Sequence, residues 1–234
     1  AVALADGATI YVDNAAEVAE PDGSATNPYA TIGAAVAAAN GGDIIIIQNG
    51  TYNENVTIDN ALTLQGESED GVIIQFDYDT RNTEATFAGT NAYPIVYSTA
   101  NLTLENLTIA GHTTKHHGIG GVLATADLMM TNVTVKDIRC TADGGEICGV
   151  QYGRGIMVEG AGDVDITNCT IQDFQKNAID LNTTGNSVIE NNTITGVGEQ
   201  QTIAQNGVVV RQGDATISGN TISDMCYNAD NEWA

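Results

Sequence analysis

The chain has 234 residues, of which 42% are hydrophobic but only 5% are aromatic, and its formal net charge is −23 from 30 acidic and 7 basic residues. A chain of this length suits one domain, and we expect residues 1–234 to form it. Nucleic acids and anionic membranes bind basic surfaces, so neither is an expected partner of so acidic a chain. No apolar run is long enough for a transmembrane helix.

The first 42 residues are predicted to hold a strand at 10–12, a polar loop and a short helix at 31–39. The helical segment is rich in alanine, and its apolar residues recur at helical spacing. These residues are Ile32, Ala35, Val36 and Ala39. Asn40-Gly-Gly42 is expected to end the helix. We expect the helix to cover the open end of the first coil of strands, which would otherwise expose its apolar core.

Five copies of one nine-residue pattern follow, beginning at residues 101, 127, 163, 186 and 214, so that successive starts are 26, 36, 23 and 28 residues apart. Each copy alternates apolar and polar residues, and the alternation changes phase at an Asn or Gly in the sixth position. This pattern predicts two short strands joined at a corner. A third strand is predicted upstream of the later copies, at 122–124, 156–158, 178–181 and 208–210. Three short strands per repeat predict a parallel β-helix.

The segment between the helix and the repeats resembles the entry segment of the pectin-lyase-like superfamily. The residues that carry the resemblance are Asn27-Pro-Tyr-Ala-Thr-Ile32, Gly42-Asp43, Gly50-Thr-Tyr-Asn-Glu54 and Leu62-Thr-Leu-Gln-Gly66. The resemblance implies an all-β fold: a single-stranded right-handed parallel β-helix with an N-terminal capping helix and with coils over 43–234. It says little about activity, because the superfamily includes lyases, esterases, hydrolases and epimerases as well as tailspikes, adhesins and surface-layer-like proteins.

Loops are predicted where the repeat is interrupted, at 77–91, 110–118, 139–153 and 198–206. The last three of these loops come after the second strand of a nine-residue copy and before the next upstream strand. One edge of the β-helix is therefore expected to carry them. Such an edge is often the functional one in repeat proteins.

The four cysteines are consistent with export. Cys140 and Cys148 are close enough in the sequence for a loop disulfide, whereas Cys169 is expected to be a buried thiol and Cys226 has no evident partner. Eight sequons offer possible glycosylation sites at Asn49, Asn55, Asn101, Asn106, Asn132, Asn168, Asn182 and Asn191. The alternative is that the repeat generates the sequons by chance, because Asn suits the left-handed backbone of a corner and Thr favours strands. We expect a secreted or cell-surface protein, either a mature chain or an excised fragment.

Candidate catalytic residues gather near the loop edge. One group is His112, Lys115, His116 and His117, and it contains every histidine of the chain. Arg154 and Arg211 flank third-strand segments, at positions where the resemblance implies catalytic or substrate-binding bases. The alternatives are an exposed polar loop for the histidines and surface charges that balance acids on neighbouring coils for the arginines. No active-site signature of the superfamily's lyases, epimerases, polygalacturonases or pectin esterases is recognisable.

Two pairs of alternating carboxylates are weak candidates for a metal site, Asp163 with Asp165 and Asp77 with Asp79. Calcium is the ion that such oxygen ligands would take, although neither pair lies in a recognised calcium loop. No cofactor is otherwise expected.

Two functions remain open from the sequence. The first, narrowly preferred, is a non-catalytic extracellular structural protein that self-assembles into a filament, sheath or adhesion subunit, because no cap closes the last coil in the sequence. The alternative is a carbohydrate-active enzyme (a polysaccharide lyase, epimerase or hydrolase) or a glycan-binding module with its site on the loop edge. The corresponding partners are a second copy of the chain or a polysaccharide.

Overall fold

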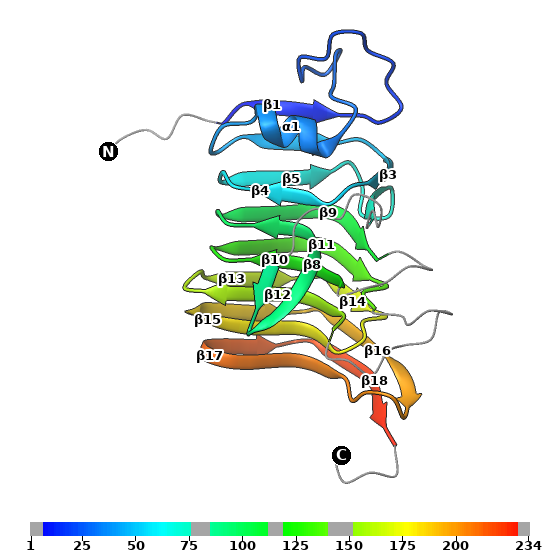
Figure 1. The fold of residues 1–234 in the computed structure, drawn as a ribbon, viewed down its shortest axis with the longest axis vertical. Coiled ribbons are helices and arrows are strands. Elements are labelled where there is room, and N and C mark those ends of the chain that lie inside the picture. The colour runs from blue at the N-terminus through cyan, green and yellow to red at the C-terminus, as the bar shows by residue number, and fades with distance from the viewer. Residues whose placement is uncertain (1–6, 76–84, 112–118, 140–151, 229–234) are drawn as a thin grey trace.

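A computed structural model describes residues 7–75, 85–111, 119–139 and 152–228. In these residues the chain winds into a right-handed parallel β-helix, as predicted, with coils that stack from the N-terminal to the C-terminal end (Figure 1). Each coil contributes strands to three parallel sheets. Sheets 1 and 2 contain the first and second halves of the repeat, and sheet 3 contains the third strand, which lies upstream of each copy. No helix in the described part of the chain has the length and hydrophobicity needed to cross a membrane.

Sheet 1 contains the first half of each repeat and begins at the N-terminal end of the chain. Its members are β1 (Thr9–Val12), β2 (Ile44–Ile47), β5 (Leu62–Gly66), the first halves of β9 (Leu102–Ala110) and β11 (Leu128–Lys136), β13 (Val164–Thr167), and the second halves of β15 (Asn177–Glu190) and β17 (Asn206–Ser218).

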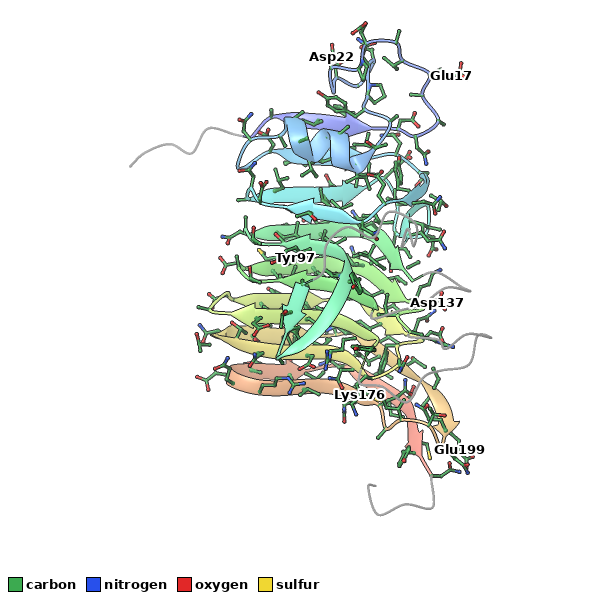
Figure 2. The ribbon with its side chains drawn as sticks, viewed as in Figure 1. Glu17, Asp22, Tyr97, Asp137, Lys176 and Glu199 are labelled. Atoms are coloured by element: carbon green, nitrogen blue, oxygen red, sulfur yellow. The ribbon has the colours of Figure 1, made fainter. Side chains whose placement is uncertain are left out.

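Sheet 2 contains the second half of each repeat. Its members are β3 (Gly50–Asn53), β6 (Val72–Gln75), the second halves of β9 and β11, β14 (Thr170–Gln172), β16 (Thr193–Gln200) and β18 (Thr221–Tyr227). Sheet 2 ends at the right-hand edge of Figure 2, where Asp137 and Glu199 are labelled.

Sheet 3 contains the predicted third strands. Its members are β4 (Val56–Ile58), β8 (Thr90–Ser98), β10 (Ile119–Ala124), β12 (Arg154–Gly160) and the first halves of β15 and β17. One short strand, β7 (Ala85–Phe87), pairs antiparallel with β8 and lies outside the parallel sheets.

The corner between sheets 1 and 2 forms where the repeat predicted it. The sixth residue of every copy has a positive φ, between 52° and 66°. These residues are Asn106, Asn132, Asn168, Asn191 and Gly219. Asn and Gly reach this left-handed region at the lowest cost, so each corner turns the chain without strain. The corner also explains how four of the eight sequons arise from the fold, while glycosylation itself stays a prediction.

The capping helix α1 (Ile32–Ala38) is confirmed, and it buries Ile32, Ala35 and Val36 at the N-terminal end of the β-helix (Figure 1). Thr31 accepts a hydrogen bond from the Ala34 amide at 3.2 Å, and the Glu54 carboxylate accepts from the Ile32 and Gly33 amides at 2.9 and 2.8 Å. A carboxylate at a helix N-terminus satisfies free amides and meets the positive end of the helix dipole. Glu54 of the entry segment is therefore a structural cap.

The loop predictions need correction in two places. Residues 85–91, expected within a loop, form β7 and the start of β8, joined by the two-residue turn Ala88–Gly89. Strand β16 extends to Gln200 because Gly198–Gln200 pairs with Met225–Tyr227 of β18, inside the loop expected at 198–206. Most of the loops expected at 110–118 and 139–153, with the Cys140–Cys148 pair, lie outside the described residues.

Cys169 is buried as predicted, and its position in the repeat also holds Leu107, Val133, Asn192 and Asn220. Burial raises the pKa of the Cys169 thiol to about 12. On the next coil, Asn192 is 1% exposed, accepts from the Cys169 amide at 2.8 Å and donates from Nδ2 to the Ile166 carbonyl at 2.8 Å. The column thus changes from apolar side chains to two hydrogen-bonded asparagines, Asn192, which is buried, and Asn220, which is half-buried.

Candidate functional site

The outward face of sheet 3 carries a buried acidic residue, Asp180, among apolar neighbours. Strand register places Asp180 of β15 beside Met157 of β12 and Val209 of β17. The corresponding residues on β8 and β10 are Tyr97 and Leu123, so Asp180 is the acidic member of a largely apolar column. Yet Asp180 is completely buried. A buried carboxylate needs charged or hydrogen-bonding partners, because its desolvation otherwise favours the neutral form.

Two arginines from the neighbouring coils supply those partners. Arg211 binds Asp180 through two nitrogens, with Nε 2.6 Å from Oδ1 and a terminal nitrogen 2.8 Å from Oδ2. This bidentate geometry is the strongest arrangement for an arginine–carboxylate pair. Arg154 approaches from the other side, with Nε 3.2 Å from Oδ2. Asn177 donates from Nδ2 to the same Oδ2 at 2.6 Å.

The backbone explains why both arginines reach Asp180. Val210 of β17 pairs with Leu181 of β15, but Gln212 pairs with Asn182, so Arg211 is an extra residue in β17. Alternation from Val209 places Arg211 on the outward face, and the bulge leaves Arg211 opposite no residue of β15, within reach of Asp180. Arg154 pairs with Asn177, at the beginning of the strands of sheet 3.

An aromatic ring covers the ion pair. Phe87, at the end of β7, is completely buried, and its ring centroid lies 5.4 Å from the Arg154 guanidinium carbon and 5.8 Å from that of Arg211. These distances are within the range of cation–π contacts. Phe87 also belongs to a small apolar cluster outside the core, with Ala85, Leu123, Met157 and Tyr97. Tyr97 is labelled near β8 in Figure 2.

The electrostatics of this face differ from those of the whole chain. The side chain of Arg154 is 7% exposed, and burial lowers its pKa more than Asp180 raises it. The hydrogen bonds that Arg211 donates to Asp180 raise the pKa of Arg211. Burial lowers the pKa of Lys176, and the charges of Arg154 and Arg211 lower it further. Three cations therefore lie within the field of Asp180, with Glu159 also acting on Arg211, in a chain that has only 7 basic residues.

The candidate catalytic residues from the sequence fall into two groups in the structure. His112, Lys115, His116 and His117 lie outside the described residues. Arg154 and Arg211 are brought together as partners of one acid on a neighbouring coil. The expectation of surface charges is wrong for Arg154, which is 6% exposed, because the β7–β8 hairpin folds over it. Sequence reasoning missed Asp180 and Phe87. The available signal for Asp180 was a charged residue within the apolar run Ala178-Ile-Asp-Leu181.

Asp163 and Asp165 belong to no metal-binding cluster among the described residues. In residues 7–75, 85–111, 119–139 and 152–228 no group of three or more His, Cys, Asp or Glu side chains could hold a metal ion. Asp163 accepts from the Asn186 amide at 2.8 Å, and Asp165 accepts from the Thr167 hydroxyl at 2.5 Å. Each carboxylate of this pair is thus used within the coils. Asp77 and Asp79 lie outside the described residues, and calcium binding stays a prediction.

Comparisons with known proteins identify the fold. A family model described as "Right handed beta helix region" matches residues 154–229. With the similar solved structures, this match supports the right-handed parallel β-helix fold. No curated protein matches the sequence.

The similar solved structures are carbohydrate-active enzymes in several cases. A pectin methylesterase in complex with a hexasaccharide is 15% identical, with a TM-score of 0.55 over 94% of this chain and 80% of that one. Pectin methylesterase PemA from Erwinia chrysanthemi is 18% identical, with a TM-score of 0.52 over 85% of this chain and 57% of that one. Escherichia coli YbhC is 16% identical, with a TM-score of 0.53 over 92% of this chain and 71% of that one.

Another pectin methylesterase, a mutant in complex with a hexasaccharide, is 16% identical, with a TM-score of 0.53 over 86% of this chain. The chain spans 66% of the length of that enzyme and 57% of the length of PemA. At these identities the likeness shows the fold alone.

Proposed function

We propose that the protein is a carbohydrate-active β-helix protein that binds an acidic polysaccharide on the outward face of sheet 3. The observation that carries the proposal is the cluster of Arg154, Lys176 and Arg211 around the single carboxylate of Asp180. Arginine forks suit carboxylates, and the uronate units of acidic polysaccharides present one carboxylate per sugar. The similar structures solved with hexasaccharides support a carbohydrate over the structural role preferred from the sequence.

The geometry favours binding over proton transfer by Asp180. Both carboxylate oxygens already accept hydrogen bonds from Arg211, and Oδ2 also accepts from Asn177. A general base needs an oxygen that can reach the substrate proton. We therefore assign Asp180 the role of holding the two guanidiniums in place, and Arg154 the role of meeting the polysaccharide.

Calorimetry with a galacturonate hexasaccharide and with a neutral hexasaccharide tests the proposal, each with and without calcium. We expect binding of the acidic sugar and a loss of roughly tenfold or more for Arg154→Gln, since a charge-assisted contact contributes about 1.5–3 kcal/mol. Arg139→Gln is the matched control, because Arg139 forms its ion pair, at 2.6 Å, with Asp173 and not with Asp180. Equal losses in both variants, or no preference for the acidic sugar, would contradict the proposal.

Self-assembly stays a second candidate, supported by one observation. Val210, Ile217 and Ile222, on the last described strands, are 42–48% exposed. A second copy stacked on this coil, or further chain, would cover these apolar side chains. Export to the medium or the cell surface is also part of the proposal, because acidic polysaccharides of this kind occur outside the cell.

A further inference from the structure

The β7–β8 hairpin stands apart from the rest of the fold. Residues 85–92 pair antiparallel, whereas the coils pair in parallel. Ala85 and Phe87 pack on the outward face of sheet 3, while the later residues of β8 belong to sheet 3 and to its core. Its turn consists of Ala88 and Gly89, with φ of 45° and 77°. A two-residue turn with both φ positive suits a hairpin, but an alanine there costs about 1 kcal/mol relative to glycine.

The hairpin closes the face that the proposed function needs. Phe87 is completely buried between the hairpin and the two guanidiniums, and beneath it Asp180 is completely buried and Arg154 is 6% exposed. A polysaccharide carboxylate cannot reach Arg154 while the ring remains there.

The charges under the ring are not balanced. Among the described residues, two guanidiniums form ion pairs with one carboxylate, Glu159 adds a negative charge near Arg211, and Lys176 adds a third cation. Arg154 Nε is buried and lies 3.2 Å from Asp180 Oδ2, yet it makes no hydrogen bond. The face of a phenyl ring compensates a cation by only about 0.5–2 kcal/mol, less than a paired carboxylate does. One further anion would complete the site.

The contacts that hold the hairpin closed are few. The Ala88 amide donates to Glu159 Oε2 at 3.2 Å, and Glu159 Oε1 accepts from Asn182 Nδ2 at 3.3 Å. The apolar contacts are limited to the cluster of Ala85, Phe87, Leu123 and Met157 with Tyr97. Small satellite clusters of this kind open locally without unfolding the core.

We propose that the β7–β8 hairpin is a removable cover, in which the Phe87 ring occupies the place over Arg154 and Arg211 that a carboxylate-bearing sugar takes when it binds. The inference rests on the proposed function for its ligand. Its structural part, closure of the arginines by Phe87, is independent of any ligand. Binding then includes the cost of opening, so apparent affinity is reduced by the fraction of closed molecules.

Two measurements on the full chain test the cover. Phenylglyoxal modifies exposed arginines, and peptide mass spectrometry gives the rate at Arg154 and at Arg211 in the wild type, Phe87→Ala and Glu159→Ala. Calorimetry with the galacturonate hexasaccharide gives the affinity of the same proteins. We expect both variants to speed modification of Arg154 and to tighten binding, by roughly tenfold for Phe87→Ala. The rate at Arg139 is the internal control, and circular dichroism verifies the fold.

The outcomes separate the two proposals. Faster modification together with tighter binding supports both. Faster modification without binding of the acidic sugar by any variant supports the cover and overturns the proposed function. Unchanged modification at Arg154 overturns the cover, and weaker binding by Phe87→Ala also overturns it, because the ring would then be part of the binding surface.

Discussion

At the residue scale, one backbone conformation per coil determines where sheet 1 turns into sheet 2. Asn168 is an informative example, because it is exposed and has a φ of 56°. Its backbone amide donates to the Glu190 carbonyl at 3.2 Å. Substitution at this position therefore tests chiefly the cost of the left-handed conformation.

We expect Asn168→Val to lower the free energy of unfolding by about 1–2 kcal/mol, because a β-branched residue is disfavoured at positive φ. Asn168→Gly is the matched control, and we expect it to stay within about 0.5 kcal/mol of the wild type, since Gly reaches this region freely. Both variants remove the same sequon, so a glycan affects them equally. Chemical denaturation measures the difference, and equal losses for Val and Gly would contradict the explanation.

At the element scale, close stacking of the strands in sheet 3 depends on glycines at inward positions. A Cβ on Gly121 of β10 would lie 2.3 Å from the Gly155 carbonyl oxygen and 2.9 Å from Val135 Cγ1. A Cβ on Gly155 of β12 would lie 2.6 Å from the Ala178 carbonyl oxygen. The glycines thus allow neighbouring backbones to approach where Arg154 and Asp180 are positioned.

Gly121→Ala is expected to lower the free energy of unfolding by about 1–3 kcal/mol, because the added methyl group must displace backbone in a packed interior. Gly41→Ala serves as the control, since a Cβ there meets no atom within 4 Å. Its effect should stay within about 0.5 kcal/mol. Thermal and denaturant unfolding both report the change, and tolerance of alanine at Gly121 would show that the coils can separate more easily than the structure implies.

At the scale of the whole molecule, burial along one column changes toward the C-terminal end. In sheet 2 the strand register aligns Ile171, Ile194 and Ile222 on successive coils. Ile171 and Ile194 are completely buried, whereas Ile222 is 48% exposed. The same side chain thus contributes differently to stability according to the coil that carries it.

Ile171→Ala is expected to lower the free energy of unfolding by about 2–5 kcal/mol, the usual range for deleting buried methyl groups. Ile222→Ala, the same chemical change on the same column, should cost less than about 1 kcal/mol, because half of the side chain already meets water. Denaturation at low and high protein concentration measures both. A large loss for Ile222→Ala that grows with concentration would indicate that another copy covers it, in favour of self-assembly.

Much of the fold could be predicted because it depends on local rules. The corner asparagines combine tolerance of positive φ with a change of alternation phase, so the two strands of each repeat were evident. The hairpin at 85–92 was not, since its turn is Ala88–Gly89 and not the Asn-Gly or Asp-Gly that marks such turns. Arg211 was found as a candidate, but its ion pair with Asp180 on the neighbouring coil leaves no pattern in the sequence.

Short sequence patterns were enough to predict the β-helix, its capping helix and its corners, because period-two alternation, helix spacing and left-handed turns act over a few residues. The meeting of Phe87, Arg154, Asp180 and Arg211 became apparent only in three dimensions. These residues come from separate coils and a hairpin, and their contacts depend on strand register, on one bulge and on a fold of the chain across the sheet. Contacts between side chains so far apart along the chain follow from the stacking of whole coils, which no short stretch of sequence encodes.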